Sequence, residues 1–403
     1  MKSVYFNEEH EMFRATARQF FEEEVAPHAD AWEHDRRIPK EIWRRMGDLG
    51  FLGIMFPEQY GGGGADIFYA TVFMEELARS RMGGFVASVM VQEFIATGAI
   101  LHHGTEAQKQ SYLAPSITGE KVGAICISEP DAGSDVANIR TRAVKDGDHY
   151  VINGAKTWIT NGVYGDFYVV AAKTNPEAGS GGISLIIVDA DAPGVTSTKL
   201  RKMGWHSSDT AEIAFENVRV PLTNLVGVEH MGFYYIMETF GIERLSCAIT
   251  SIGSCDFILE ETLKYMKDRE AFGRPITKFQ ALRHRLADLF TELEAARQLV
   301  YHTAWLFKHG ENPVREASMA KMMASELQKK IADECLQFHG GFGYVEEYAI
   351  ERFYRDARVG TIVAGTSEIM REIIAKVDID GLVFPKVEAR LAKAKAESGD
   401  ASR

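Results

Sequence analysis

One glutamate in this chain has no basic partner within its own stretch of helix. Glu243 lies in METFGIERLSCAITSIG, a largely apolar segment with helical spacing. The positions three and four residues away on the same face hold no positive charge; they are Thr239, Phe240, Ser246 and Cys247. A carboxylate in such surroundings either finds an ion-pair partner elsewhere in the fold or faces a cavity, where it could serve as a base. The residues alone leave both interpretations open.

A second carboxylate interrupts an apolar segment near the N-terminus. Glu93 is the only charged residue in GFVASVMVQEFIATGAIL, which has the character of a helix buried on all sides. A buried glutamate is usually satisfied by hydrogen bonds. We therefore favour a structural role for Glu93 over a role in a site.

Two segments in the middle of the chain expose hydroxyls and a large ring at the ends of expected strands. Cys126–Asp135 (CISEPDAGSD) turns through Pro130 and Gly133, and the loop suits a polar ring or a phosphate. Lys156–Asn161 (KTWITN) places Trp158 beside hydroxyl residues. Trp158 either packs in the core, which is the favoured interpretation for the segment alone, or stacks on a planar ligand.

A third group of candidates follows the β-rich part of the chain. Arg269 offers a fixed fork of donors for a phosphate, and the glycines of Gln337–Gly341 allow close approach of another backbone. The alternative is a surface arginine and an ordinary loop. Gly365-Thr366-Ser367-Glu368 closes the last loop of this region.

The elements that must position these residues change in type along the chain. Residues 7–110 have helical spacing, and short β-branched runs separated by turns extend from Gly119 to about Pro221. Long helical segments follow at about 229–267, 276–309, 313–339 and 362–376. We predict an α+β fold with an N-terminal helical domain (1–117), a central antiparallel β-domain (118–227), a C-terminal four-helix bundle (228–385) and a polar tail (386–403).

Composition excludes several classes of function. The net charge of −12 disfavours nucleic acid as a partner. No uninterrupted apolar run reaches about 18 residues, so we expect no membrane span. The four scattered cysteines form neither CxxC nor a pairing with histidine, which predicts reduced thiols and no metal site. With an acidic N-terminus unlike a signal peptide, these features predict a cytoplasmic protein.

Taken together, the motifs resemble those of the acyl-CoA dehydrogenase family of flavoproteins. ISEPDAGSD and KTWITN are similar to the family's flavin loops, and KMGWHSSDTAEIAFENVRVP and REAFG are similar to two further elements. Gln337–Asp356 fits the family's second signature, and the resemblance extends to about residue 380. Two positions depart from the usual pattern: Asn138 replaces a small residue and His206 replaces an arginine.

The resemblance implies that the chain binds FAD at a face of the β-domain and at a subunit interface. Trp158 is expected to lie against the flavin ring, with Ser128 and Thr160 at its polar edge. Thr366 and Glu368 are expected to complete the cofactor site.

In the family, a neighbouring subunit also contributes to this cofactor. Its arginine and phenylalanine correspond here to Arg269 and Phe272, with Gln280 nearby. Its glutamine–glycine segment corresponds to the residues from Gln337 to Gly341. The family expectation is therefore a homo-oligomer, and a homotetramer in particular.

The resemblance also resolves the two interpretations of Glu243. Many relatives carry the catalytic glutamate just before the Gly-Thr of the last loop, where this chain has Ala364. In isovaleryl-CoA and long-chain acyl-CoA dehydrogenases the base instead precedes an arginine in a Glu-Arg-Leu triplet, as Glu243 precedes Arg244 here. We therefore identify Glu243 as the expected catalytic base, while the backbone N–H of Ala364 still polarises the thioester carbonyl.

The remaining expected contacts concern the substrate. Ser134 matches a position that contacts CoA, and Arg244 and the Ala364 N–H complete the substrate-binding set. The helix of Glu93 resembles the one that lines the acyl pocket, so this residue is the rival carboxylate.

The implied reaction is α,β-dehydrogenation of a branched or medium- to long-chain acyl-CoA, with electrons passing to an electron-transferring flavoprotein. A flavin-dependent monooxygenase or oxidase on the same fold is the alternative. A third interpretation, a non-enzymatic flavoprotein that binds a macromolecule, is disfavoured by the intact motifs and the acidic charge.

Overall fold

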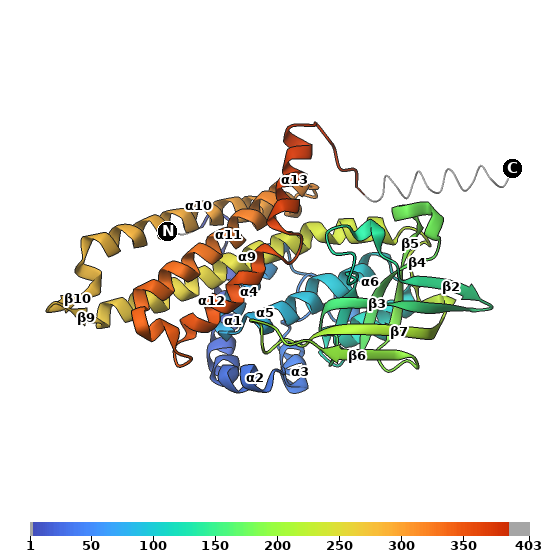
Figure 1. Ribbon diagram of the computed structural model, residues 1–403, viewed down its shortest axis with the longest axis horizontal. Coiled ribbons are helices and arrows are strands. Elements are labelled where there is room, and N and C mark those ends of the chain that lie inside the picture. Colours follow the sequence, from blue (N-terminus) through green and yellow to red (C-terminus); the bar gives the residue numbers. More distant parts are fainter. Residues whose placement is uncertain (1–2, 387–403) are drawn as a thin grey trace.

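Within the described residues, helices form the N-terminal and C-terminal parts and a sheet forms the middle (Figure 1). This computed structural model describes residues 3–386. The predicted polar tail therefore lies outside the described residues from position 387 onward. The α+β fold, with a helical N-terminal part, a central sheet and a helical C-terminal part, is confirmed.

The N-terminal part consists of short helices around an aromatic core. They are α1 (Glu8–Phe20), α2 (Ala29–Asp35), α3 (Lys40–Asp48), α4 (Ile67–Glu76), α5 (Gly83–Met90), α6 (Thr97–His103), α7 (Glu106–Gln108) and α8 (Ala114–Ile117). Asn7 caps α1 by accepting from the His10 N–H at 3.0 Å, while the Asn7 N–H donates to the His10 ring.

One helical run in this part passes through the middle of the molecule. Gly83–His103 joins α5 and α6 through a π-helical segment, Val91–Ala96, that carries Glu93. Contrary to the expectation from the sequence, its 21 residues are long and apolar enough to cross a membrane by length and composition. In the folded chain, however, 89% of its most apolar window is buried, which is the position of a core helix.

The central sheet is mainly antiparallel, as predicted. Its strands are β1 (Gly123–Cys126), β2 (Arg142–Asp146), β3 (His149–Thr160), β4 (Phe167–Lys173), β5 (Ile183–Asp189), β6 (Val195–Lys199), β7 (Thr210–Pro221) and β8 (Leu225–Val226). They lie in the order β6-β7-β3-β2-β4-β5-β8, with β1 against β4. The β1–β4 pair is parallel, because the chain between them makes the β2–β3 hairpin and returns in the same direction.

The C-terminal part is built on three long helices that lie side by side (Figure 1). They are α9 (Gly232–Asp268), α10 (Gln280–Lys308) and α11 (Val314–His339). The short strands β9 (Glu270–Ala271) and β10 (Arg274–Pro275) join α9 to α10 at one tip, and α12 (Ala349–Ala357) and α13 (Ser367–Asp378) pack on α11.

The start of the last helix differs from its prediction. It begins at Ser367 rather than at residue 362. Ala364 and Gly365 have φ angles of 55° and 89°, in the left-handed region that a right-handed helix cannot include. Thr366 then caps α13 by accepting from the Ile369 N–H at 3.3 Å.

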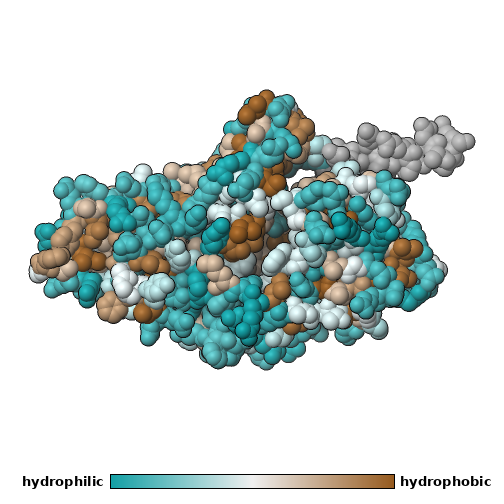
Figure 2. All heavy atoms as spheres, viewed as in Figure 1, coloured by the Kyte–Doolittle hydropathy of each residue, from teal (hydrophilic) through white to brown (hydrophobic). Residues whose placement is uncertain are grey.

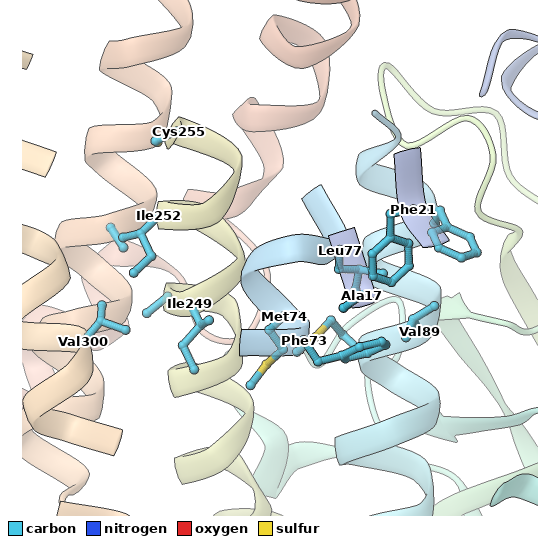
Figure 3. Close-up of a cluster of buried hydrophobic side chains, with 14 of the residues drawn as sticks. Ala17, Phe21, Phe73, Met74, Leu77, Val89, Ile249, Ile252, Cys255 and Val300 are labelled. Atoms are coloured by element: carbon cyan, nitrogen blue, oxygen red, sulfur yellow. The ribbon is translucent and has the colours of Figure 1, made fainter. Parts of the chain in front are cut away.

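One hydrophobic core joins the N-terminal helices to the long helices. Figure 3 shows Phe21, Phe73 and Leu77 from the N-terminal part beside Ile249 and Ile252 of α9. All five side chains are buried. This core fixes the inner face of α9 and so determines where its remaining side chains point.

Candidate active site

Glu243 lies on α9 away from the residues that anchor this helix in the core. Leu245 and Ile249 are fully buried, whereas Glu243 is half-buried. Its Oε2 is shielded from solvent and accepts no hydrogen bond within residues 3–386. Of the two interpretations that the sequence left open, the structure therefore shows no hydrogen-bonded ion pair at this oxygen.

Two buried cations act electrostatically on this carboxylate. Arg244 is buried, its Nε is shielded without a partner in the described part of the chain, and its guanidinium carbon lies 5.5 Å from the centre of the Phe240 ring. Lys321 of α11 is also completely buried. Burial raises the pKa of Glu243 to about 7, and the charges of Arg244 and Lys321 limit that rise. Such a carboxylate is ionised in a useful fraction at neutral pH and is a stronger base than an exposed one.

The loop before α13 is hydrogen-bonded to Lys321, one of these two cations. The Lys321 ammonium donates to the Gly365 carbonyl at 2.7 Å. Ala364, the residue before Gly365, has no carboxylate in its side chain. Its φ is positive, a conformation that a non-glycine residue keeps only where the surrounding structure determines it. Thr366 is half-buried and Glu368 is exposed at the first turn of α13. Lys321 thus links the loop that contains Ala364 to the surroundings of Glu243.

The two predicted flavin loops of the β-domain are joined by a buried ion pair. Lys156 Nζ lies 2.8 Å from Glu129 Oε1, and it also donates to the Ile127 carbonyl at 3.0 Å. The Thr157 N–H donates to the carbonyl of Ser128 at 3.0 Å. The segment with Ser128 therefore lies directly against the segment with Trp158.

Trp158 itself does not pack in the core. Its side chain is 66% exposed and its φ is 64°, at an irregularity in the pairing of β3 with β7. A non-glycine residue with a positive φ is strained, and such residues cluster at functional sites, so the exposed indole is a candidate ligand contact. Thr160 is half-buried two residues further on, and Ser134 is exposed on the neighbouring loop.

The third predicted group gathers at the tip of the long helices. Arg269, Gln337 and Gly341 line one cavity of about 630 Å³. An added Cβ at Gly341 would meet no atom within 4 Å, so the backbone there is open to an approaching group. Phe272 and Gln280 are exposed beside the cavity but do not line it.

Within one chain these groups do not form a single site. Figure 1 shows β9 and β10 at one end of the molecule and the sheet with β3 at the other. Arg269 and Phe272 therefore lie far from Trp158 and Ser128. Figure 2 shows apolar side chains gathered at the tip with β9 and β10, where Phe272 is 95% exposed and Tyr344 is 84% exposed.

Glu93, the rival carboxylate, has a different environment. It is 1% exposed, and its two oxygens accept from the N–H groups of Gly53 and Ile54 at 2.7 and 2.9 Å. Burial raises its pKa to about 8, and the two donors oppose that shift. These bonds are those expected of a structural glutamate that braces a turn of the N-terminal part.

Neither Lys321 nor the Lys156–Glu129 pair was predicted from the sequence. A signal for Lys321 was present, because its neighbours three and four positions away are small: Ala317, Ser318, Ala324 and Ser325. A lysine in the middle of a small-residue face points into a helix contact. The cysteines are free as expected, and residues 3–386 contain no cluster of three or more potential metal ligands.

The sequence matches three family models in succession. They are described as acyl-CoA dehydrogenase, N-terminal domain (residues 7–120), middle domain (124–218) and C-terminal domain (230–378). The chain is also 42% identical over 374 residues to a mitochondrial long-chain specific acyl-CoA dehydrogenase of Mus musculus, covering 92% of this chain and 86% of that protein. The chain belongs to the acyl-CoA dehydrogenase family.

Other relatives support this assignment. A subunit of the caffeyl-CoA reductase–Etf complex of Acetobacterium woodii is 43% identical over 376 residues, covering 92% of this chain and 98% of that subunit. The crystal structure of an acyl-CoA dehydrogenase from Geobacillus kaustophilus superposes with a TM-score of 0.91 at 44% identity, covering 94% and 100% of the two chains. A glutaryl-CoA dehydrogenase from Mycobacterium smegmatis in complex with FADH2 superposes with a TM-score of 0.89 at 29% identity, covering 94% and 97%.

Membership of the acyl-CoA dehydrogenase family makes the chain a flavoprotein oxidoreductase that acts on acyl-CoA, with FAD as its cofactor. The residues present fit this cofactor. Trp158 offers an exposed planar ring, and Arg269 offers a guanidinium beside the open backbone of Gly341.

Proposed function

We propose that the protein catalyses α,β-dehydrogenation of an acyl-CoA thioester to the trans-2-enoyl-CoA, with Glu243 as the base. The observation that carries this proposal is the shielded, unpartnered Oε2 of Glu243 in a site where Ala364 has no carboxylate. A buried oxygen without a donor costs free energy, which a base recovers when it takes a proton from substrate.

The reaction divides between the chain and its cofactor. Glu243 removes the α-proton, and the electron pair of the broken Cα–H bond becomes the new Cα–Cβ double bond. The Ala364 N–H polarises the thioester carbonyl, which makes the α-proton more acidic. Bound FAD supplies the acceptor for the hydride that leaves Cβ. Arg244, buried next to Glu243, contributes positive charge to the same substrate site.

The cofactor would be held by the residues that the sequence pointed to. Trp158 would cover the flavin ring, with Ser128 and Thr160 at its polar edge and Thr366 and Glu368 on the C-terminal side. Ser134, exposed on the β-domain, would contact the CoA moiety.

A second copy of the chain would complete each cofactor site. Arg269 and Phe272 lie at the opposite end of the chain from Trp158, so a partner must supply them if all contact one FAD. The exposed aromatic side chains at this tip support a subunit contact. We therefore propose a homo-oligomer, specifically a homotetramer, in which Gln280, Gln337 and Gly341 also reach the neighbour's cofactor.

The electron acceptor is proposed from the relatives. One 43% identical protein is a subunit of a reductase–Etf complex, which supports an electron-transferring flavoprotein as partner here. The 42% sequence identity to a long-chain specific acyl-CoA dehydrogenase supports a branched or medium- to long-chain substrate. The position of the proposed base, Glu243 on α9, supports the same substrate class. The cytoplasmic location stays a prediction.

The test is anaerobic mixing of the purified holoenzyme with a panel of short, long and branched acyl-CoAs. The proposal predicts bleaching of the flavin absorbance without oxygen, and formation of the 2-enoyl-CoA in equal amount. Flavin that stays oxidised with every acyl-CoA would overturn the proposal. Product formed only with oxygen consumption would support the oxidase or monooxygenase alternative.

A further inference from the structure

We propose that Lys321 is a positioning residue that couples the base to the loop opposite it. Its ammonium group fixes the Gly365 carbonyl, and with it the orientation of the Ala364 N–H, while its charge keeps Glu243 ionised. This inference rests on the proposed function, because it assigns Glu243 and Ala364 the roles given above.

The geometry of Lys321 is unusual for a lysine. The side chain is 0% exposed, in the middle of α11, where that helix packs against α9 and α13. Lysine is almost never fully buried unless it is paired with an opposite charge. Its one hydrogen bond to the described chain, to the Gly365 carbonyl, satisfies one donor and leaves its charge to be balanced by a neighbouring anion.

Glu243 is the anion that can balance the positive charge of Lys321. Glu243 and Cys247 lie one turn apart on α9 and both interact electrostatically with Lys321. Burial raises the pKa of the Cys247 thiol to about 12, so this group is neutral at physiological pH. Arg244, on α9, is the second cation beside Lys321 of α11. A buried site with two cations and one carboxylate favours the ionised carboxylate.

The remaining charged groups around Lys321 are more weakly placed. Glu326 of α11 pairs with Arg371 at 2.7 Å on a half-exposed surface, and Glu368 of α13 is exposed. Both are screened by solvent. Burial lowers the pKa of Lys321 and the charge of Arg244 lowers it further, whereas the charge of Glu243 opposes that shift.

The bond to Gly365 matters because the loop is conformationally strained. Ala364 has a φ of 55° and Gly365 a φ of 89°. A non-glycine residue keeps a left-handed conformation only where its surroundings determine it. One peptide unit, Ala364–Gly365, separates the Gly365 carbonyl from the Ala364 N–H, and both residues that flank it have a positive φ. A donor that fixes the carbonyl therefore limits the rotations at Ala364 and Gly365 that would reorient the N–H.

The test compares Lys321→Met with the parent holoenzyme and with Lys330→Met. Methionine has nearly the same length but no charge and no donor. Lys330, on the same helix, pairs with Glu292 at 2.6 Å and is half-exposed, so its variant controls for loss of a lysine from α11. The rate of anaerobic flavin reduction is measured from pH 6 to pH 10 with the best acyl-CoA.

We expect Lys321→Met to raise the apparent pKa of the rate profile by about one unit or more. From a parent pKa of about 7, a shift of one unit lowers the rate at pH 7 by about fivefold or more, and part of this loss is recovered at high pH. Lys321→Arg, which keeps the charge, should retain the parent profile, and Lys330→Met should not change it. A Lys321→Met profile identical to that of the parent overturns the inference.

A second readout does not depend on turnover. The infrared carbonyl band of protonated Glu243 is isolated as the difference between each protein and its Glu243→Gln counterpart, and is followed against pH. The band should persist to higher pH in Lys321→Met. If Lys321→Met does not fold, Lys321→Gln serves in both measurements, and an unshifted band and profile contradict the inference.

The proposed function and the role of Lys321 fail in different ways. If the parent reduces its flavin with none of the acyl-CoAs, the proposed function is wrong. If the parent is active and the profile and band of Lys321→Met match those of the parent, the proposed function stands and the role of Lys321 is wrong.

Discussion

Two glutamates in this protein show opposite ways of placing a carboxylate oxygen out of contact with solvent. Glu93 and Glu243 both lie on helices beside the core, and burial raises the pKa of each, to about 8 and about 7. Glu93 accepts two backbone N–H groups, from Gly53 and Ile54. Glu243 has an oxygen shielded from solvent that accepts none among the described residues, and two cations nearby.

The difference between them is the one expected between a structural carboxylate and a reactive one. Hydrogen bonds from rigid backbone donors occupy both oxygens of Glu93, which suits a structural role. Glu243 has a shielded Oε2 that receives no such bond from the described residues, and neighbouring charges limit the rise of its pKa. The Glu129–Lys156 pair is a third case, in which a buried carboxylate is matched by a direct cation contact at 2.8 Å.

The largest expected difference between the two glutamates is catalytic. Glu243→Gln should slow anaerobic flavin reduction by about a thousandfold, because an amide cannot accept the α-proton. Glu93→Gln should change the rate less than about tenfold. Stopped-flow absorbance with the best acyl-CoA measures both variants at equal FAD content. If flavin reduction slowed equally in the two variants, the assignment of a catalytic role to Glu243 and a structural role to Glu93 would be wrong.

The same two variants should differ in stability, in the opposite order. Glu93→Gln turns an accepting oxygen into an NH₂ group that faces a backbone N–H, and should cost about 1–3 kcal/mol. Glu243→Gln removes no hydrogen bond of the shielded Oε2 and should not lower the free energy of unfolding by more than about 1 kcal/mol. Urea unfolding of matched holoenzymes measures both. A larger loss in Glu243→Gln would show that its carboxylate is mainly structural.

The dependence on pH gives a further contrast. With Glu243 ionising at about pH 7, the rate should fall about tenfold for each unit below that value and be level above it. The folded chain also keeps this proton where the unfolded chain has lost it, so the contribution of Glu243 to stability falls as pH rises from 4.5 to about 7. Glu243→Gln should remove this slope, and thermal unfolding across pH tests whether it does.

The smallest expected effect concerns the loop. Ala364→Gly keeps the backbone N–H and suits the positive φ, so flavin reduction should stay within about threefold of the parent rate and stability within about 1 kcal/mol. Stopped-flow rates and urea unfolding measure the two quantities. A loss of about a hundredfold would assign the Ala364 methyl group a role beyond carrying the amide.

Local patterns in the sequence predicted the parts of the fold that depend on local structure. Helical spacing placed α9, α10 and α11 to within a few residues, and the lack of a basic residue three or four positions away marked Glu243 as a candidate. The choice of Glu243 as the expected base came from the family resemblance. The start of α13 was misplaced, because nothing in an alanine indicates the left-handed conformation of Ala364.

Contacts between distant segments were the part that could not be predicted. The parallel pairing of β1 with β4 depends on how the β2–β3 hairpin closes, and the irregularity that exposes Trp158 depends on β7. Lys321 reaches Gly365 only because α11 packs between α9 and α13. The separation of Arg269 from Trp158, on which the proposed second subunit rests, is likewise a property of the fold as a whole.

The assignment of Glu243 as the base can be tested by following the α-proton alone. An acyl-CoA whose β-carbon is replaced by sulfur can lose its α-proton but cannot give up a β-hydride. Exchange of its α-hydrogens with deuterated solvent, measured by NMR, therefore reports the base without flavin reduction. We expect rapid exchange with the parent and with Glu93→Gln, and loss of exchange by about a thousandfold with Glu243→Gln. Exchange at the parent rate in folded, FAD-bound Glu243→Gln would contradict the assignment of the base.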